Sequence, residues 1–203
     1  MTGPAPAVEL LGDELPEEEI VDDGDAAPPG APSPTTSGTW PGPSAARWVA
    51  FAGIAIMALV VDQLSKAWLV AMLPDPGDQR VVIDGWLNLV HGRNSGALFG
   101  LLPQSAPIFA VVSLGVVALI VVYHRRAGRG HLTTLALGLL LGGAIGNLLD
   151  RLQFGYVVDW VDMGVGSWRF FTYNIADAAI TTAILLLIGM ALLPRLAEWG
   201  ADG

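Results

Sequence analysis

The sequence predicts an all-α membrane protein in which four helices cross the bilayer, and two observations lead to this fold class. Hydrophobic residues make up 53% of the 203-residue chain and charged residues only 14%, which is more apolar than an ordinary soluble domain. Four apolar stretches follow one another, at residues 48–73, 106–123, 132–149 and 175–193. Each is close to the roughly 20 residues that a helix needs to cross a hydrocarbon core of about 30 Å.

The first 46 residues differ in composition from the rest of the chain. They contain nine acidic residues, no Lys or Arg, and nine of the fourteen prolines, a composition that predicts disorder. They lack the basic and apolar regions of a signal peptide. The net charge of −9 belongs to this segment, because the remaining ten acidic and ten basic residues cancel. We therefore expect a disordered acidic Pro-rich tail at 1–46, a four-helix domain at 47–195 and a short C-terminal tail at 196–203.

The short loops predict how the helices are oriented. The hairpin at 124–131 contains three arginines, and Lys and Arg are enriched in cytoplasmic loops. Arg47 before the first helix and Arg195 after the fourth agree with this, so both termini are expected in the cytoplasm. The loops at 74–105 and 150–174 then face outward. Basic residues are not otherwise clustered, so no nucleic-acid partner is expected. The absence of cysteine excludes disulfides and cysteine nucleophiles.

Polar side chains gather towards the outer ends of the predicted helices. Such groups are costly in lipid and are usually functional. Asp62 lies about 22 Å along the first helix, at 1.5 Å per residue, and can pair with Lys66 four residues later. The other polar residues lie at the outer end of the third helix, in the outer loop and at the start of the fourth helix: Asn147, Asp150, Arg151, Asp159, Asp162, Asn174 and Asp177.

Asp159 and Asp177 differ from the other carboxylates in their sequence surroundings. Asp62/Lys66 and Asp150/Arg151 are spaced as ion pairs that hold helices together, whereas neither Asp159 nor Asp177 has a basic residue within one helical turn in sequence. Two carboxyls brought together in apolar surroundings share a proton, which supplies an acid and a base side by side. Taken singly, an Asp at a helix start is more often an N-terminal cap.

Small residues recur every four positions along the third predicted helix. Thr134, Gly138, Gly142 and Gly146 form a ridge, and Gly143 lies beside it. Ridges of this kind let helix backbones approach closely in lipid. The pattern therefore predicts helix packing rather than ligand binding.

Five ordered blocks resemble those of the lipoprotein signal peptidase (signal peptidase II) family. They are DQLSK at 62–66, NSGALFG at 94–100, GGAIGNLLDR at 142–151, GYVVDW at 155–160 and YNIADAAI at 173–180. Any one block is a weak signal, but five in order across 47–195 are specific. Trp160 and Tyr173 stand where the family usually has Phe, and both keep an aromatic ring.

The resemblance implies a membrane aspartic endopeptidase in which Asp159 and Asp177 are the catalytic pair. Its substrate would be a diacylglyceryl-modified prolipoprotein in the bacterial inner membrane, cut at the extracytoplasmic face just before the lipidated Cys. Lipids would be the other partner, and no cofactor or metal is expected. The family fold adds a small extracytoplasmic β-cradle, to which the β-favouring stretch 80–90 is suited, and a short helix. Supporting roles in the site are implied for Asp62, Lys66, Asn94, Asn147, Asp150, Arg151 and Asn174.

Two other functions fit the same residues. A small transporter or proton channel also carries intramembrane carboxylates, although transporters place them near the midplane and show repeated halves, and no repeat is visible here. A metal-dependent hydrolase could bind Mg²⁺ or Ca²⁺ through oxygen ligands. Its candidate ligands are Asp150, Asp159, Asp162 and Asp177.

Overall fold

The computed structural model describes residues 3, 42–95, 106–127 and 130–198. Most of the predicted disordered tail, and the segment 96–105 within the second motif block, lie outside these residues. The described residues from 42 onward belong to one compact unit, with the following elements in chain order: α1 (Ala45–Met72), β1 (Gln79–Ile83), β2 (Leu87–Asn94), α2 (Ala106–Ala127), α3 (His131–Phe154), β3 (Val157–Val165), β4 (Trp168–Arg169), α4 (Ile175–Leu192) and α5 (Pro194–Glu198).

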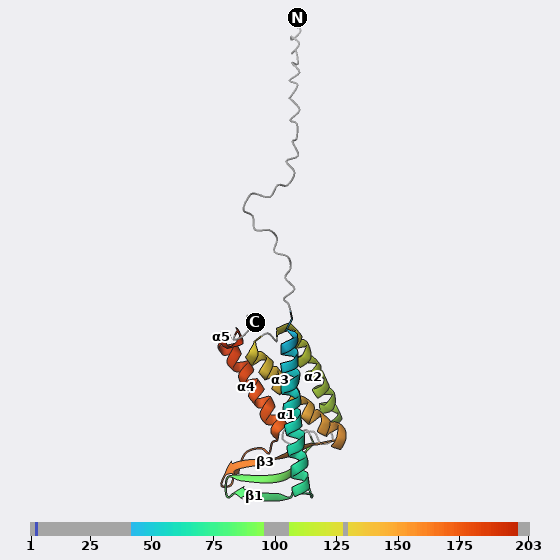
Figure 1. Cartoon of the computed structure of the whole chain (residues 1–203), viewed down its shortest axis with the longest axis vertical. Helices are drawn as coiled ribbons and strands as arrows, with labels where there is room; N and C mark the ends of the chain where they lie inside the picture. The colour runs from blue at the N-terminus through green and yellow to red at the C-terminus, as the bar shows by residue number, and fades with distance from the viewer. Residues whose placement is uncertain (1–2, 4–41, 96–105, 128–129, 199–203) are drawn as a thin grey trace. The chain divides into compact units, whose positions relative to one another are not determined.

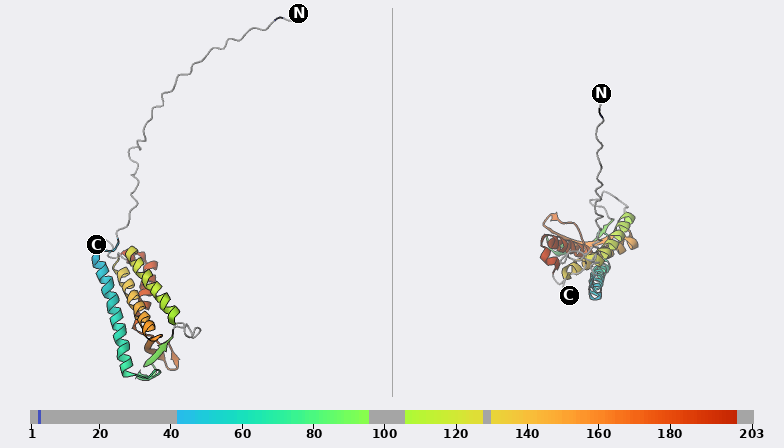
Figure 2. Two further views of the ribbon diagram at one scale, coloured as in Figure 1. Left: turned by 90° about the vertical axis from the view of Figure 1, so that its right-hand side faces the viewer. Right: turned by 90° about the horizontal axis from the view of Figure 1, so that it is seen from above.

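The four predicted membrane spans are confirmed as helices. In the described part of the chain, α1, α2, α3 and α4 are long and apolar enough to cross a membrane. Helix α3 is central. In its most apolar 18-residue stretch 67% of the residues are buried, against at most 22% in the corresponding stretches of the other three helices. Figures 1 and 2 show α1, α2 and α4 arranged around it. The other three helices therefore expose most of their apolar surface to lipid.

The small-residue ridge of α3 packs as predicted. A Cβ added to Gly138 would lie 2.8 Å from the Ile54 side chain, and one added to Gly142 would collide with the α1 backbone. Gly143 serves a different neighbour, because its Cβ would lie 2.6 Å from the carbonyl oxygen of Ala176 in α4. The glycines of α3 thus hold α1 and α4 close on two sides.

A four-stranded antiparallel sheet, in the order β1-β2-β3-β4, lies at the end of the helices where α4 begins (Figure 1). We call this the sheet end. The all-α label is therefore only partly right. The stretch 80–90, which the resemblance assigned to the cradle, contains most of β1, the turn at 84–86 and the first half of β2. Asp159 and Asp162 were expected in a loop but lie in β3, where the neighbouring Val157, Val158 and Val161 favour a pleated, half-buried strand.

The resemblance also implied a short helix beside the four spans. The short helix that the structure does describe, α5, follows α4 at the opposite end from the sheet (Figure 1). It also takes in part of the predicted C-terminal tail, which was expected to start at residue 196. The segment 96–105, which joins β2 to α2, lies outside the described residues.

Candidate active site

A buried ion cluster lies where α1 and α3 meet the sheet. Lys66 Nζ lies 2.7 Å from Asp62 Oδ2 and 2.8 Å from Asp150 Oδ2, and none of the three side chains is more than 5% exposed. Lys66 also donates a hydrogen bond of 3.2 Å to Asn147 Oδ1. The predicted pairing of Asp62 with Lys66 is present. The pairing of Asp150 with Arg151 is wrong, because the Asp150 carboxylate reaches across to α1 instead.

The two carboxylates of this cluster also bind backbone N–H groups. Asp62 Oδ1 accepts a hydrogen bond of 2.9 Å from Ala176 N, in the first turn of α4. Asp150 Oδ2 accepts one of 3.1 Å from Val158 N, in β3. An anion at a helix N-terminus is stabilised by the helix dipole, and hydrogen bonds to ionised acceptors are the stronger ones. The cluster therefore ties α1, α3, α4 and β3 together.

Gln63 is a structural member of the cluster that the sequence did not single out. Its Nε2 lies within hydrogen-bond distance of Asp62 Oδ2 (3.1 Å), Asp150 Oδ1 (3.0 Å) and the Gly146 carbonyl (3.3 Å). Its position beside Asp62 in the first motif block was the available signal. Without the fold, nothing indicated that Asp150 would lie on its other side.

Asp159 and Asp177 are held by asparagine side chains. Asn174 Nδ2 donates to Asp159 Oδ1 at 2.7 Å, and Asn94 Nδ2 donates to Asp159 Oδ2 at 2.9 Å. Asn147 Nδ2 donates to Asp177 Oδ1 at 2.8 Å. Both aspartates were predicted to belong to the site, and the structure places them in one hydrogen-bonded network.

A direct chain of hydrogen bonds joins the two aspartates. Asn174 and Asp177 form the capping box of α4, in which Asn174 Oδ1 accepts from Asp177 N at 2.9 Å and Asp177 Oδ2 accepts from Asn174 N at 3.3 Å. Asn174 Nδ2 also lies 3.2 Å from Asn147 Oδ1. The N-terminal cap is therefore Asn174 rather than Asp177, which takes part in the capping box and is linked to Asp159 through Asn174.

The environment of Asp159 favours its neutral form. The pKa of the Asp159 carboxyl is raised to about 6, chiefly by burial and also by the nearby charge of Asp177, although the hydrogen bonds from Asn94 and Asn174 lower it. Asp162 behaves in the opposite way. Its hydrogen bonds from Arg169, 2.8 Å away in the ion pair, lower the pKa of the Asp162 carboxyl.

The carboxylates considered for a metal site are dispersed. Asp150 is paired with Lys66, and Asp162 is bound by Arg169 and by Asn88 Nδ2 at 3.0 Å. Within 42–95, 106–127 and 130–198, no group of three or more His, Asp or Glu side chains is arranged to hold a metal ion.

Arg151 lies near the site, but it does not form the ion pair with Asp150 that its position next to Asp150 suggested. Its Nη1 donates a hydrogen bond of 3.1 Å to the Asn147 carbonyl, and its guanidinium lies 5.8 Å from the centre of the Phe109 ring in α2. It interacts electrostatically with Asp177, Asp159 and Asp150. All the residues predicted for the site therefore lie in one region, at the junction of the helices with the sheet.

This fold and this site define a multi-pass membrane protein with a buried polar centre at one end of its helices. Residues 54–193 match the sequence model of the family described as signal peptidase (SPase) II. A lipoprotein signal peptidase of Syntrophomonas wolfei subsp. wolfei is 38% identical over 143 residues, which are 70% of this chain and 93% of that protein. That of Moorella thermoacetica is 39% identical over 142 residues, which are 70% and 91% of the two chains. This chain belongs to the signal peptidase II family.

Two solved structures support the fold, and each is described as a bacterial membrane enzyme. One is 30% identical with a TM-score of 0.64 and covers 70% of this chain and 87% of its own. The other is 32% identical with a TM-score of 0.63 and covers 70% and 92%.

Proposed function

We propose that this protein is an aspartic endopeptidase that removes the signal peptide from diacylglyceryl-modified prolipoproteins by cutting just before the lipidated Cys. Its family supports a membrane protease that removes signal peptides from prolipoproteins. The aspartic mechanism is supported by one observation above all. Asp159 and Asp177 come from different elements and are joined through Asn174 and Asn147 in a buried network.

The network leaves both carboxylates able to act on a water molecule. Each carboxylate oxygen of Asp159 and Asp177 accepts one N–H donor, and a carboxylate oxygen has a further lone pair available. One carboxylate takes a proton from a water molecule as the oxygen of that water attacks the scissile carbonyl carbon. The other carboxyl donates its proton to the leaving amide nitrogen as the carbon–nitrogen bond breaks. The two groups titrate as a pair.

The direct test is cleavage by the purified full-length chain in detergent or nanodiscs. We expect it to cut a prolipoprotein that carries the diacylglyceryl group, to leave the unmodified precursor intact, and to keep its rate in excess chelator. Loss of the rate on chelation, with recovery on adding Mg²⁺, would establish the metal-dependent reaction instead. Absence of cleavage combined with proton flux across liposomes would establish the transporter.

The pH dependence of kcat/KM follows from the pKa of Asp159. Because the pKa of Asp159 is about 6, the pair holds one proton below about pH 6 and loses it above. Because the reaction needs one proton on the pair, kcat/KM is expected to fall as the pH rises through about 6. At low pH both carboxyls are protonated, so kcat/KM should also fall as the pH is lowered into the acid range. A value of kcat/KM that rises through this range to a plateau would mean that the fully ionised pair is the active form.

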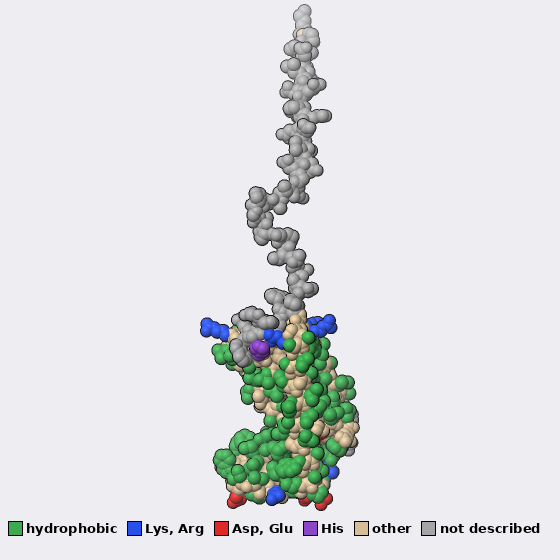
Figure 3. Space-filling model, viewed as in Figure 1, with side chains coloured by type: hydrophobic (Ala, Val, Ile, Leu, Met, Phe, Trp, Pro, Cys, Tyr) green, Lys and Arg blue, Asp and Glu red, His purple; other side chains and the backbone are tan. Residues whose placement is uncertain are grey.

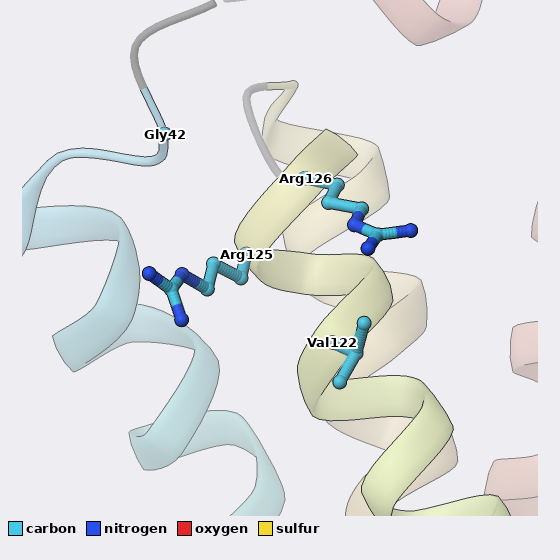
Figure 4. A pocket seen from close by; sticks show the side chains of 4 residues that line it. All are labelled: Gly42, Val122, Arg125 and Arg126. Carbon is cyan, nitrogen blue, oxygen red and sulfur yellow. The ribbon is translucent and has the colours of Figure 1, made fainter. Parts of the chain in front are cut away.

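We also propose that the site faces the extracytoplasmic side of the bacterial inner membrane, with both termini in the cytoplasm. Among the described residues, Figure 3 shows Lys and Arg but no acidic side chains at the end opposite the sheet, whereas the sheet end carries both. Arg125 and Arg126 line a cavity of about 690 Å³ there, together with Gly42 and Val122 (Figure 4). This distribution agrees with the enrichment of basic residues on the cytoplasmic side.

Cysteine labelling tests this orientation cleanly, because the native chain has no cysteine. In intact cells, an impermeant maleimide should label Asp75→Cys, in the turn between α1 and β1. It should label Gly128→Cys, in the arginine-rich hairpin, only after the membrane is opened. The reverse pattern would place the site in the cytoplasm.

A further inference from the structure

The hairpin turns of the sheet carry a group of exposed apolar side chains. Trp86, Val165, Trp168 and Phe170 expose 57%, 60%, 64% and 58% of their surfaces. We call these four residues the sheet tip. Soluble surfaces rarely expose contiguous apolar patches of this kind, and those that do usually bind a partner or a membrane.

Backbone hydrogen bonds connect the two hairpin turns that carry the sheet tip. Gly166 N donates to the Gly85 carbonyl and Gly164 N to the Trp86 carbonyl, both at 2.9 Å, so the two hairpin turns are bonded to each other. Gly85 and Gly166 have φ of 70° and 60°, a left-handed conformation that glycine adopts without strain. The Trp168 and Phe170 rings contact each other with centroids 4.7 Å apart.

Three members of the sheet tip lie on the face of the sheet that carries Asp159. Arg169 reaches Asp162, so its neighbours Trp168 and Phe170 point to the opposite face, because side chains alternate along a strand. Val165 pairs with Trp168 in the register and shares that face. Asp159 is three residues from Asp162 in β3, and it too lies on the face opposite Asp162.

This face is also the one from which a membrane span rises. Asn174, the cap of α4, donates to Asp159, and the apolar helix begins at the next residue. Phe170 lies only five positions before that start. The sheet tip is therefore close in sequence to the start of the membrane span α4.

We propose that the sheet tip is a membrane anchor, which inserts into the phospholipid leaflet on the same side of the bilayer as Asp159. The surface of the sheet seen in Figure 3 is largely hydrophobic, and its acidic and basic side chains lie at the edge farthest from the helices. The tip thus continues the lipid-facing surface of α4. Trp and Phe suit this position, because aromatic rings are enriched where hydrocarbon meets headgroups.

Insertion of the tip would hold Asp159 at a defined depth. If the substrate is lipid-modified, which rests on the proposed function, its scissile bond lies close to the same interface. The anchor would then keep Asp159 at the same depth in the membrane as that bond.

Site-directed spin labelling tests insertion without relying on activity. Val165→Cys and Trp168→Cys are labelled in the full-length chain, in nanodiscs of phosphatidylethanolamine and phosphatidylglycerol without substrate. Gln79→Cys, exposed at the start of the edge strand β1, is the matched control. Labels at the tip should collide more with oxygen, which concentrates in lipid, than with a water-soluble nickel chelate, and the Gln79 label should show the reverse.

Two results would overturn the anchor. One is equal access of the nickel chelate to Val165, Trp168 and Gln79 labels. The other is protection of the tip only after lipidated prolipoprotein is added, which would make it a surface for the substrate polypeptide. Because Val165→Cys keeps every aromatic side chain, a folding defect at Trp168 leaves the test intact. Failure of the proposed function would appear separately, as absence of cleavage with the tip still inserted.

Discussion

Asp159→Asn and Asp177→Asn are each expected to abolish cleavage of a lipidated prolipoprotein, with the largest effect of any substitution considered. Both carboxylates belong to the network through Asn174 and Asn147. Removing either carboxylate takes away the shared proton, and with it both the acid and the base. The double variant should be little worse than either single one, because residues that act as a unit are strongly non-additive.

The matched control is Asp162→Asn, the same substitution three residues along the same strand. Asp162 points away from the site and pairs with Arg169 at a partly exposed position, so its loss should leave the turnover of the folded protein near the native rate. Turnover is measured with purified variants, alongside binding of the lipidated substrate. Substantial residual turnover in Asp159→Asn or Asp177→Asn, with the substrate still bound, would rule out the two-aspartate mechanism.

Asp62→Ala is expected to cause the largest loss of stability among the substitutions considered. It leaves a buried backbone N–H without its acceptor, which alone costs about 1–3 kcal/mol in the free energy of unfolding, and it removes a carboxylate bonded to Lys66. The pairing of Asp62 with Lys66 that the sequence predicted does not by itself account for this loss. The structure changes the reason, because Lys66 still has Asp150 at 2.8 Å. The Ala176 N–H in the first turn of α4 loses its acceptor as well.

Thermal unfolding of purified variants in detergent measures this effect. Ser65→Ala is a suitable control, because within the described part of the chain the Ser65 hydroxyl donates to the Asp62 carbonyl of its own helix, α1. Asp62→Ala should melt well below the native protein, and any remaining folded fraction should retain some cleavage. Native stability together with complete inactivity would instead assign Asp62 a direct part in the chemistry.

The sequence alone determined the parts of this protein that depend on local pattern. Apolar runs of about 20 residues predict spans, and the four helices follow them closely because lipid leaves the backbone few alternatives to a helix. The four-residue spacing of Gly138 and Gly142 predicted close packing, since it places both on one helix face. The five motif blocks indicated the family and the residues of the site.

The tertiary structure decided the pairings that sequence spacing could not. Asp150 and Arg151 are neighbours in sequence, yet Asp150 pairs with Lys66 in α1. The strand that carries Asp159 was missed because a short apolar run of this kind is ambiguous in sequence and is confirmed only by its hydrogen-bonded partner, β2. The contact of Gln63 with both Asp62 and Asp150 could not be predicted from the sequence either, because Asp150 lies far from Gln63 along the chain. Contacts between distant segments depend on how the helices pack, and a buried carboxylate takes whichever donor that packing brings within reach.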